Sequence, residues 1–133
     1  MLYAILCYDA EEVVGQWTPE EDAAAIGKLG AVIEKIGAQG RLGPVARLMP
    51  TTASTSIRKG KEALVIDGPF AETKEQLLGF YVVDCDNLDH AIETAQELAR
   101  ASSSAGTFEL RPLRMFMPGT GVGSDAALES VGG

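Results

Sequence analysis

The chain has few residues of the kinds that bind metals, form disulfides or attract nucleic acid. Its 133 residues include one histidine and two cysteines, and only 6% are aromatic. Asp and Glu number 19 against 11 Lys and Arg, which gives a formal net charge of -8 at pH 7. This acidic balance opposes attraction to phosphate backbones and to anionic lipid surfaces. We therefore expect no nucleic-acid partner and no membrane partner.

The sequence also lacks a long hydrophobic run and a cluster of metal ligands. No apolar run approaches the roughly 20 residues that cross a bilayer. The short run Leu2–Cys7 has no basic leader and precedes an acidic segment, which favours a strand over a signal peptide. Cys7 and Cys85 lie in separate apolar runs without a CxxC or Cys/His motif, which is typical of buried free thiols. The sequence thus predicts a cytoplasmic protein without a metal or other cofactor.

The length fits one domain of ordinary size. Apolar periodicity and turn residues predict strands at 2–8, 41–48, 55–58, 63–66, 79–85 and 107–111, and helices at 18–39 and 87–101. Thr18-Pro19-Glu20-Glu21 supplies an N-cap, a first-turn proline and a capping-box glutamate for the first helix. The two strands at 55–66 read as a β-hairpin with a charged turn, and 71–78 as a polar connection with at most one helical turn.

This order of elements predicts an α+β fold, the ferredoxin-like βαββαβ pattern with an inserted β-hairpin. The domain is expected to cover residues 1–113, followed by a flexible C-terminal tail or arm at 114–133. Two helices can cover only one face of such a sheet, yet strands 2–8 and 79–85 carry apolar side chains on both faces. We therefore expect a homodimer that covers the second face, a dimeric α/β barrel with room for a small-molecule ligand.

Charged side chains gather directly after the strand that ends at residue 66. Three of them can donate or accept a proton and are the candidate catalytic residues: Asp67, Lys74 and Glu72. The candidate substrate-binding residues are Phe70, Glu75, Arg47 and Tyr81. A structural explanation competes with each of these roles. Asp67-Gly68-Pro69 is a good turn sequence, Phe70 is expected to anchor the core, and the residues that follow fit a solvated turn with local ion pairs.

The same segment carries a family resemblance. Asp67-Gly68-Pro69-Phe70, followed by Glu72-Thr73-Lys74-Glu75-Gln76-Leu77-Leu78-Gly79-Phe80-Tyr81, resembles the signature of the DGPF branch of the YCII-related proteins. The Leu88-Asp89-His90-Ala91 and Glu109-Leu110-Arg111-Pro112 segments are similar to that branch as well. The resemblance implies a ferredoxin-like, dimeric α/β barrel in small bacterial cytosolic proteins, mostly without an established activity. It also implies that some relatives are lyases of the dehydrochlorinase type, which use a His–Asp pair.

This chain differs from those lyases in its first helix, which contains no histidine. His90, the single histidine, lies off the apolar stripe of the second helix and is expected to face solvent. Two functions therefore stay open. One is a lyase or isomerase that uses Asp67 with Lys74 and a glutamate, and the other is a ligand-binding or regulatory module that uses the same pocket without turnover.

Overall fold

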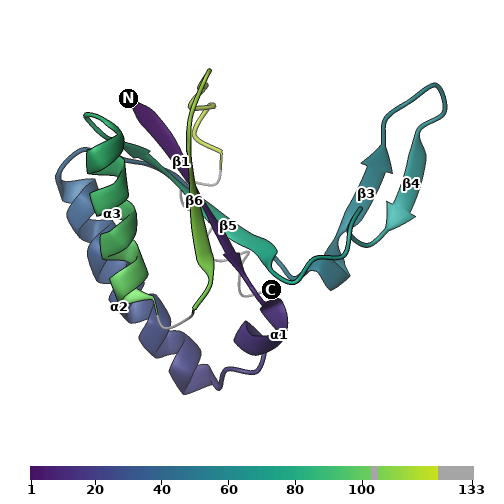
Figure 1. The fold of residues 1–133 in the computed structure, drawn as a ribbon, viewed down its shortest axis with the longest axis horizontal. Coiled ribbons are helices and arrows are strands. Elements are labelled where there is room, and N and C mark those ends of the chain that lie inside the picture. The colour runs from purple at the N-terminus through teal and green to yellow at the C-terminus, as the bar shows by residue number, and fades with distance from the viewer. Residues whose placement is uncertain (103–104, 123–133) are drawn as a thin grey trace.

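The computed structural model describes residues 1–102 and 105–122, and its main body is a four-stranded antiparallel sheet with two long helices (Figure 1). The body consists, in chain order, of β1 (Leu2–Asp9), α1 (Glu11–Val14), α2 (Pro19–Ala38), β2 (Leu42–Arg47), β5 (Gln76–Asp84), α3 (Leu88–Ala101) and β6 (Thr107–Pro112). The strand order β2-β5-β1-β6 places the first and third body strands at the centre of the sheet. This α+β arrangement is consistent with the predicted ferredoxin-like fold.

Both long helices lie on one face of the sheet (Figure 1). Alternate residues of the central strands, Tyr3 and Ile5 on β1 and Tyr81 and Val83 on β5, belong to a buried cluster that also contains Ile36, Ala91, Ala95 and Leu98 from the helices. Because side chains alternate along a strand, the residues between them point to the opposite face. That open face, as we call it, carries Leu2, Ala4, Leu6, Phe80 and Val82 on the central strands, so the central strands are apolar on both faces as predicted.

The helix boundaries follow from local sequence signals. Thr18 caps α2 by accepting a hydrogen bond from the Glu21 backbone N–H, and the Glu21 carboxylate accepts one from the Thr18 N–H, which completes the predicted capping box. Gly40 follows the end of α2 with a φ of 71°, a conformation that favours glycine. Asn87 caps α3 by accepting a hydrogen bond from the His90 N–H.

The predicted hairpin forms a separate two-stranded sheet, β3 (Thr55–Arg58) and β4 (Leu64–Asp67), preceded by the short helix η1 (Thr51–Ala53). We call residues 55–67 the arm. Figure 1 shows that it projects away from the sheet and helices of the body. We call Ser54 and Gly68, the residues that flank the arm, its foot. The foot lies near the end of the body sheet where β2 ends and β5 begins.

Four sequence-based expectations need correction. The acidic segment after β1 contains the short helix α1, and β5 begins at Gln76 because its first residues pair with the end of β1. Phe70 does not anchor the core, since its side chain is 82% exposed beside the arm. His90 is half-buried, and its Nδ1 accepts a hydrogen bond from the Asp86 N–H.

The chain continues beyond β6 without further regular elements in residues 113–122. The Leu113 N–H donates a hydrogen bond to the Leu2 carbonyl, which holds the start of this segment against β1. The rest of the predicted tail, residues 123–133, lies outside the described residues. In the described part of the chain, no helix combines the length and hydropathy needed to span a bilayer.

Candidate functional site

A cavity of about 540 Å³ lies between the helices and the sheet, and its volume is that of a small-molecule site. Most of its lining is apolar and comes from α2, α3 and the strands of the body sheet, including Leu29, Ile33, Leu78, Phe108 and Leu110. A few polar side chains interrupt this lining, among them Cys7, Asp9, Asp22, Arg47, Tyr81, Gln96 and Ser102. An apolar wall with few polar groups suits a ligand with an apolar body and one or two polar atoms.

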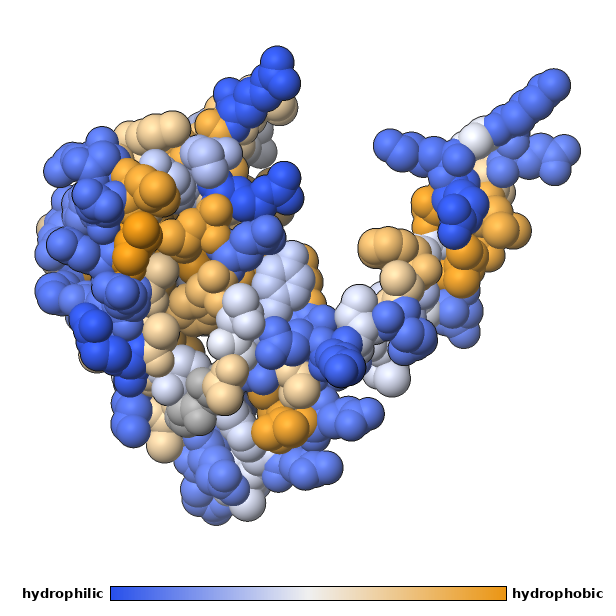
Figure 2. Space-filling view, viewed as in Figure 1, coloured by the Kyte–Doolittle hydropathy of each residue, from blue (hydrophilic) through white to orange (hydrophobic). Residues whose placement is uncertain are grey.

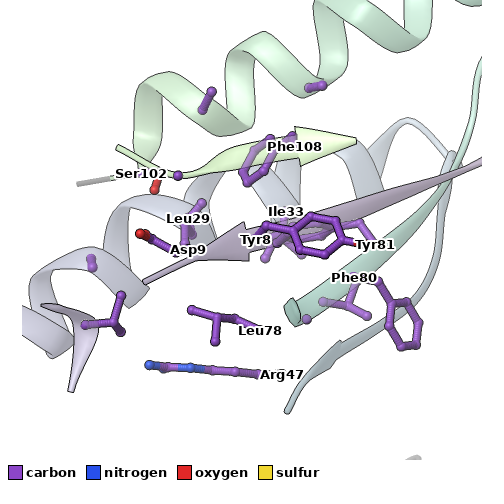
Figure 3. Close-up of a pocket in the computed structure, with 18 of the residues that line it drawn as sticks. Tyr8, Asp9, Leu29, Ile33, Arg47, Leu78, Phe80, Tyr81, Ser102 and Phe108 are labelled. Carbon is purple, nitrogen blue, oxygen red and sulfur yellow. The ribbon is translucent and has the colours of Figure 1, made fainter. Parts of the chain in front are cut away.

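Asp9 lies at the end of β1 and brings one carboxylate to the cavity lining (Figure 3). Its Oδ1 accepts a hydrogen bond of 2.7 Å from the Ala10 N–H, which fixes the orientation of the carboxylate. Its Oδ2 is buried and accepts no hydrogen bond from any residue that the structure describes. A buried acceptor without a donor costs free energy, on the order of 1–3 kcal/mol, and is uncommon in folded proteins. A donor on a bound molecule would remove this cost.

An irregularity in the sheet accompanies Asp9. The register between β1 and β5 shifts after Cys7, which pairs with Gly79, while Tyr8 pairs with Leu77. Leu78 is therefore left without a partner on β1, and it lines the cavity. In the view of Figure 3, Leu78 lies between Asp9 and Arg47. Bulges of this kind are frequent next to functional sites, where they redirect side chains.

Arg47 provides the basic group of the lining, at the end of β2. One of its guanidinium nitrogens lies 3.1 Å from Asp22 Oδ1, and both side chains are partly exposed, so this ion pair contributes little to stability. Its other N–H groups have no partner among the described residues, which leaves them available to an acceptor on a ligand.

Tyr81 and Cys7 are the titratable groups of the cavity that burial affects most. Burial raises the pKa of the Cys7 thiol from 9.0 to about 12. Burial and the nearby Cys7 raise the pKa of Tyr81 from 10.0 to about 12, against the opposing effect of Arg47. Both groups therefore stay protonated at neutral pH. Tyr81 is available as a neutral hydrogen-bond donor, and Cys7 is a poor nucleophile.

The residues predicted from the sequence divide between two regions. Arg47 and Tyr81 line the cavity. The others lie near the arm, outside the cavity lining: Asp67, Phe70, Glu72, Lys74 and Glu75. Asp67, Glu72 and Lys74 are exposed, and within the described residues none of the three forms an ion pair. Their role in a ligand site stays a prediction.

Sequence reasoning missed Asp9, although a signal was present. Asp9 follows Tyr3, Ile5 and Cys7 at a spacing of two residues, and that spacing places all four side chains on one face of a strand. A carboxylate in register with a buried apolar face is a candidate functional group. Trp17 also lines the cavity, and it is the single tryptophan of the chain.

The described residues offer no group of three or more histidine, cysteine, aspartate or glutamate side chains that could hold a metal ion. His90 lies at the start of α3 and is not part of the cavity lining. The polar groups of the cavity lining include a carboxylate from Asp9, a guanidinium from Arg47 and a phenol from Tyr81.

The sheet topology and the cavity define an α+β domain of the ferredoxin-like kind with an internal apolar site. The chain also matches the family model of the YCII-related domain over residues 1–117, so it belongs to the YCII-related domain family. It is 52% identical over 120 residues to the uncharacterized protein R00369 of Rhizobium meliloti (strain 1021), a match that covers 90% of this chain and 97% of that protein. These comparisons confirm the family resemblance, and the name of the relative states no activity.

Proposed function

We propose that the chain binds a small, mainly apolar molecule in the cavity and holds it through a hydrogen bond to Asp9. The observation that carries this proposal is the Asp9 carboxylate, which lines an apolar cavity of about 540 Å³ and whose buried Oδ2 has no donor among the described residues. The ligand would therefore carry a hydroxyl or N–H donor on an apolar body. An acceptor or anionic group on the ligand would find the Arg47 guanidinium.

Proton transfer of the lyase or isomerase type is the reaction that these groups would support. Asp9 Oδ2 would take a proton from the ligand, and the electron pair of the broken bond would stay on the ligand. Arg47 and the neutral Tyr81 hydroxyl would stabilise the resulting negative charge. The electron pair would then accept a proton at another atom in an isomerase, or expel a leaving group in a lyase.

The functional unit in this proposal is a homodimer in the cytosol. Support for the dimer comes from the open face: Leu2, Leu6 and Phe80 are partly exposed there, and neither long helix of the described residues lies on that face. A second copy placed on this face would remove their apolar surface from water. The two cysteines, both free thiols, would stay reduced in that compartment.

Fluorescence of Trp17 tests the binding proposal, because this single tryptophan lines the cavity. The probe is 2-naphthol, an aromatic alcohol that offers one hydroxyl donor, and the matched control is 2-methoxynaphthalene, which offers none. We expect saturable quenching of Trp17 by 2-naphthol with one site per chain. The methoxy compound should bind about 10- to 100-fold more weakly, the effect of losing a hydrogen bond to a charged acceptor. Equal affinity, or no saturable quenching by either compound, would overturn the proposal.

Exchange of carbon-bound protons tests the catalytic step separately. The probe is 2-tetralone, an apolar ketone with acidic protons next to its carbonyl. The intact protein should speed deuterium incorporation from D2O at that position, and Asp9→Asn should lose at least ten-fold of this acceleration. Equal rates with and without protein would instead support the ligand-binding module without turnover.

A further inference from the structure

The arm exposes hydrophobic side chains on both of its faces. Ile57 and Val65 are paired across its two strands and are 64% and 65% exposed. Leu64 belongs to the opposite face and is 55% exposed, and Ile66 and Phe70 border a hollow of about 190 Å³ beside the same strands. Figure 2 shows hydrophobic surface along the arm, next to a hydrophilic tip. Apolar surface gathered on a projecting element is typical of an interaction site.

The foot of the arm is held by hydrogen bonds, whereas its strands lack cover from the body within residues 1–102 and 105–122. The Gly68 N–H donates to the Ser54 carbonyl at 2.9 Å, and the Ser56 hydroxyl donates to the Gly68 carbonyl at 2.7 Å. Thr51, just before the foot, donates hydrogen bonds from its backbone N–H and its hydroxyl to the Glu11 carboxylate. An isolated two-stranded hairpin is at best marginally stable in water. Hydrogen bonds thus hold the base of the arm. Among the described residues, its two strands pair only with each other and no body element packs on them to stabilise them.

The charge of the arm tip is opposite to that of the chain. Arg58, Lys59 and Lys61 lie at the tip with one acidic residue, Glu62, while the formal net charge of the whole chain is -8. Residues 9–22 contain six acidic side chains and no basic one. The basic tip of one copy would therefore be attracted by the negative charge of a second copy.

The open face supplies the remaining surface that a stable contact needs. Specific interfaces bury about 800 Å² on each partner, more than so short a hairpin offers by itself. The open face adds apolar surface to that of the arm, because its Leu2, Leu6 and Phe80 are only half-buried. We propose that the arm packs against a second copy of this chain and extends the contact made by the open face. This inference rests on the homodimer proposed above.

Charged substitutions in the arm test this inference. The variant is Ile57→Glu with Val65→Glu, and the control is Leu88→Glu, since Leu88 is an apolar residue 53% exposed on α3, outside both the arm and the acidic residues 9–22. Light scattering of the full chain at micromolar concentration should give twice the chain mass for the parent and for the control. The arm variant should need at least ten-fold higher concentration to dimerise. The milder tip variant Lys59→Glu with Lys61→Glu should also weaken the dimer.

Trypsin provides a second measurement that needs no substitution, because Arg58, Lys59 and Lys61 are cleavage sites in the arm. Cleavage there should be slow in concentrated protein and faster on dilution below the dimer dissociation constant. A parent that is monomeric at every concentration would overturn both the homodimer and the role of the arm, and would assign the arm to a different partner. A dimer that all arm variants leave unchanged, with cleavage independent of concentration, would overturn the role of the arm alone. The Trp17 titration tests the cavity independently of both results.

Discussion

Filling the cavity from α2 should increase stability and abolish ligand binding at the same time. Gly30 lines the cavity, and a Cβ built on it would meet no atom within 4 Å. The substitution Gly30→Leu would place an isobutyl group at this wall. A helical Gly costs about 0.8–1.0 kcal/mol relative to Ala, and Leu is nearly as good a helix former as Ala. We therefore expect a gain of roughly 0.5–1 kcal/mol, which corresponds to an increase in melting temperature of about 2–5 °C in a domain of this size.

Gly27 provides the matched control because it is on the same helix and its Cβ would also meet no atom within 4 Å, but it does not line the cavity. Gly27→Leu should raise the melting temperature by a similar amount and leave the affinity for 2-naphthol unchanged. Gly30→Leu should weaken that affinity at least ten-fold. Calorimetry and Trp17 quenching measure the two quantities. If Gly30→Leu binds 2-naphthol as tightly as Gly27→Leu does, the ligand does not occupy this cavity.

Two further predictions concern stability. Gly106→Ala should destabilise the fold by more than about 2 kcal/mol, because a Cβ there would overlap the Tyr8 carbonyl oxygen, whereas Gly60→Ala at the open arm tip should change stability by less than about 1 kcal/mol in urea denaturation. The raised pKa values of Cys7 and Tyr81, both about 12, mean that the folded state keeps protons that the unfolded chain loses above pH 9 to 10. These two groups should therefore add no pH dependence to stability between about pH 7 and 8, and between about pH 9 and 12 they should lower it by up to roughly 1.4 kcal/mol per pH unit for each group. Tyr81→Phe should reduce this slope in denaturation curves.

The sequence predicts the fold well where local signals and periodicity agree. The Thr18 capping box, the glycine after α2 and the hairpin at 55–66 all have short-range signals, and the structure confirms each of them. The start of β5 has no such signal, since Gln76 and Leu77 join the sheet only because the end of β1 lies beside them. Tertiary pairing decided that boundary.

The candidate site was only partly predictable. Arg47 is predictable because a guanidinium at a strand end suits a ligand carboxylate, and Tyr81 because a phenol on a central strand needs a polar partner. Asp9 was missed because the predicted strand ends at residue 8, whereas β1 and its side-chain alternation extend to Asp9. Phe70 was expected in the core on its hydropathy alone, but a large apolar side chain at a turn can equally be exposed toward a partner.

The preference for a hydroxyl donor, measured in two variants, tests the central claim most directly. Asp9→Asn keeps an acceptor for the Ala10 N–H but removes the charge, so the melting temperature should change little, while the 10- to 100-fold preference for 2-naphthol over 2-methoxynaphthalene should largely disappear. Asp67→Asn, at the exposed carboxylate beside the arm, should retain the full preference. An unchanged preference in Asp9→Asn would contradict the account. Loss of the preference in Asp67→Asn instead would place the site in the segment that the sequence alone first indicated.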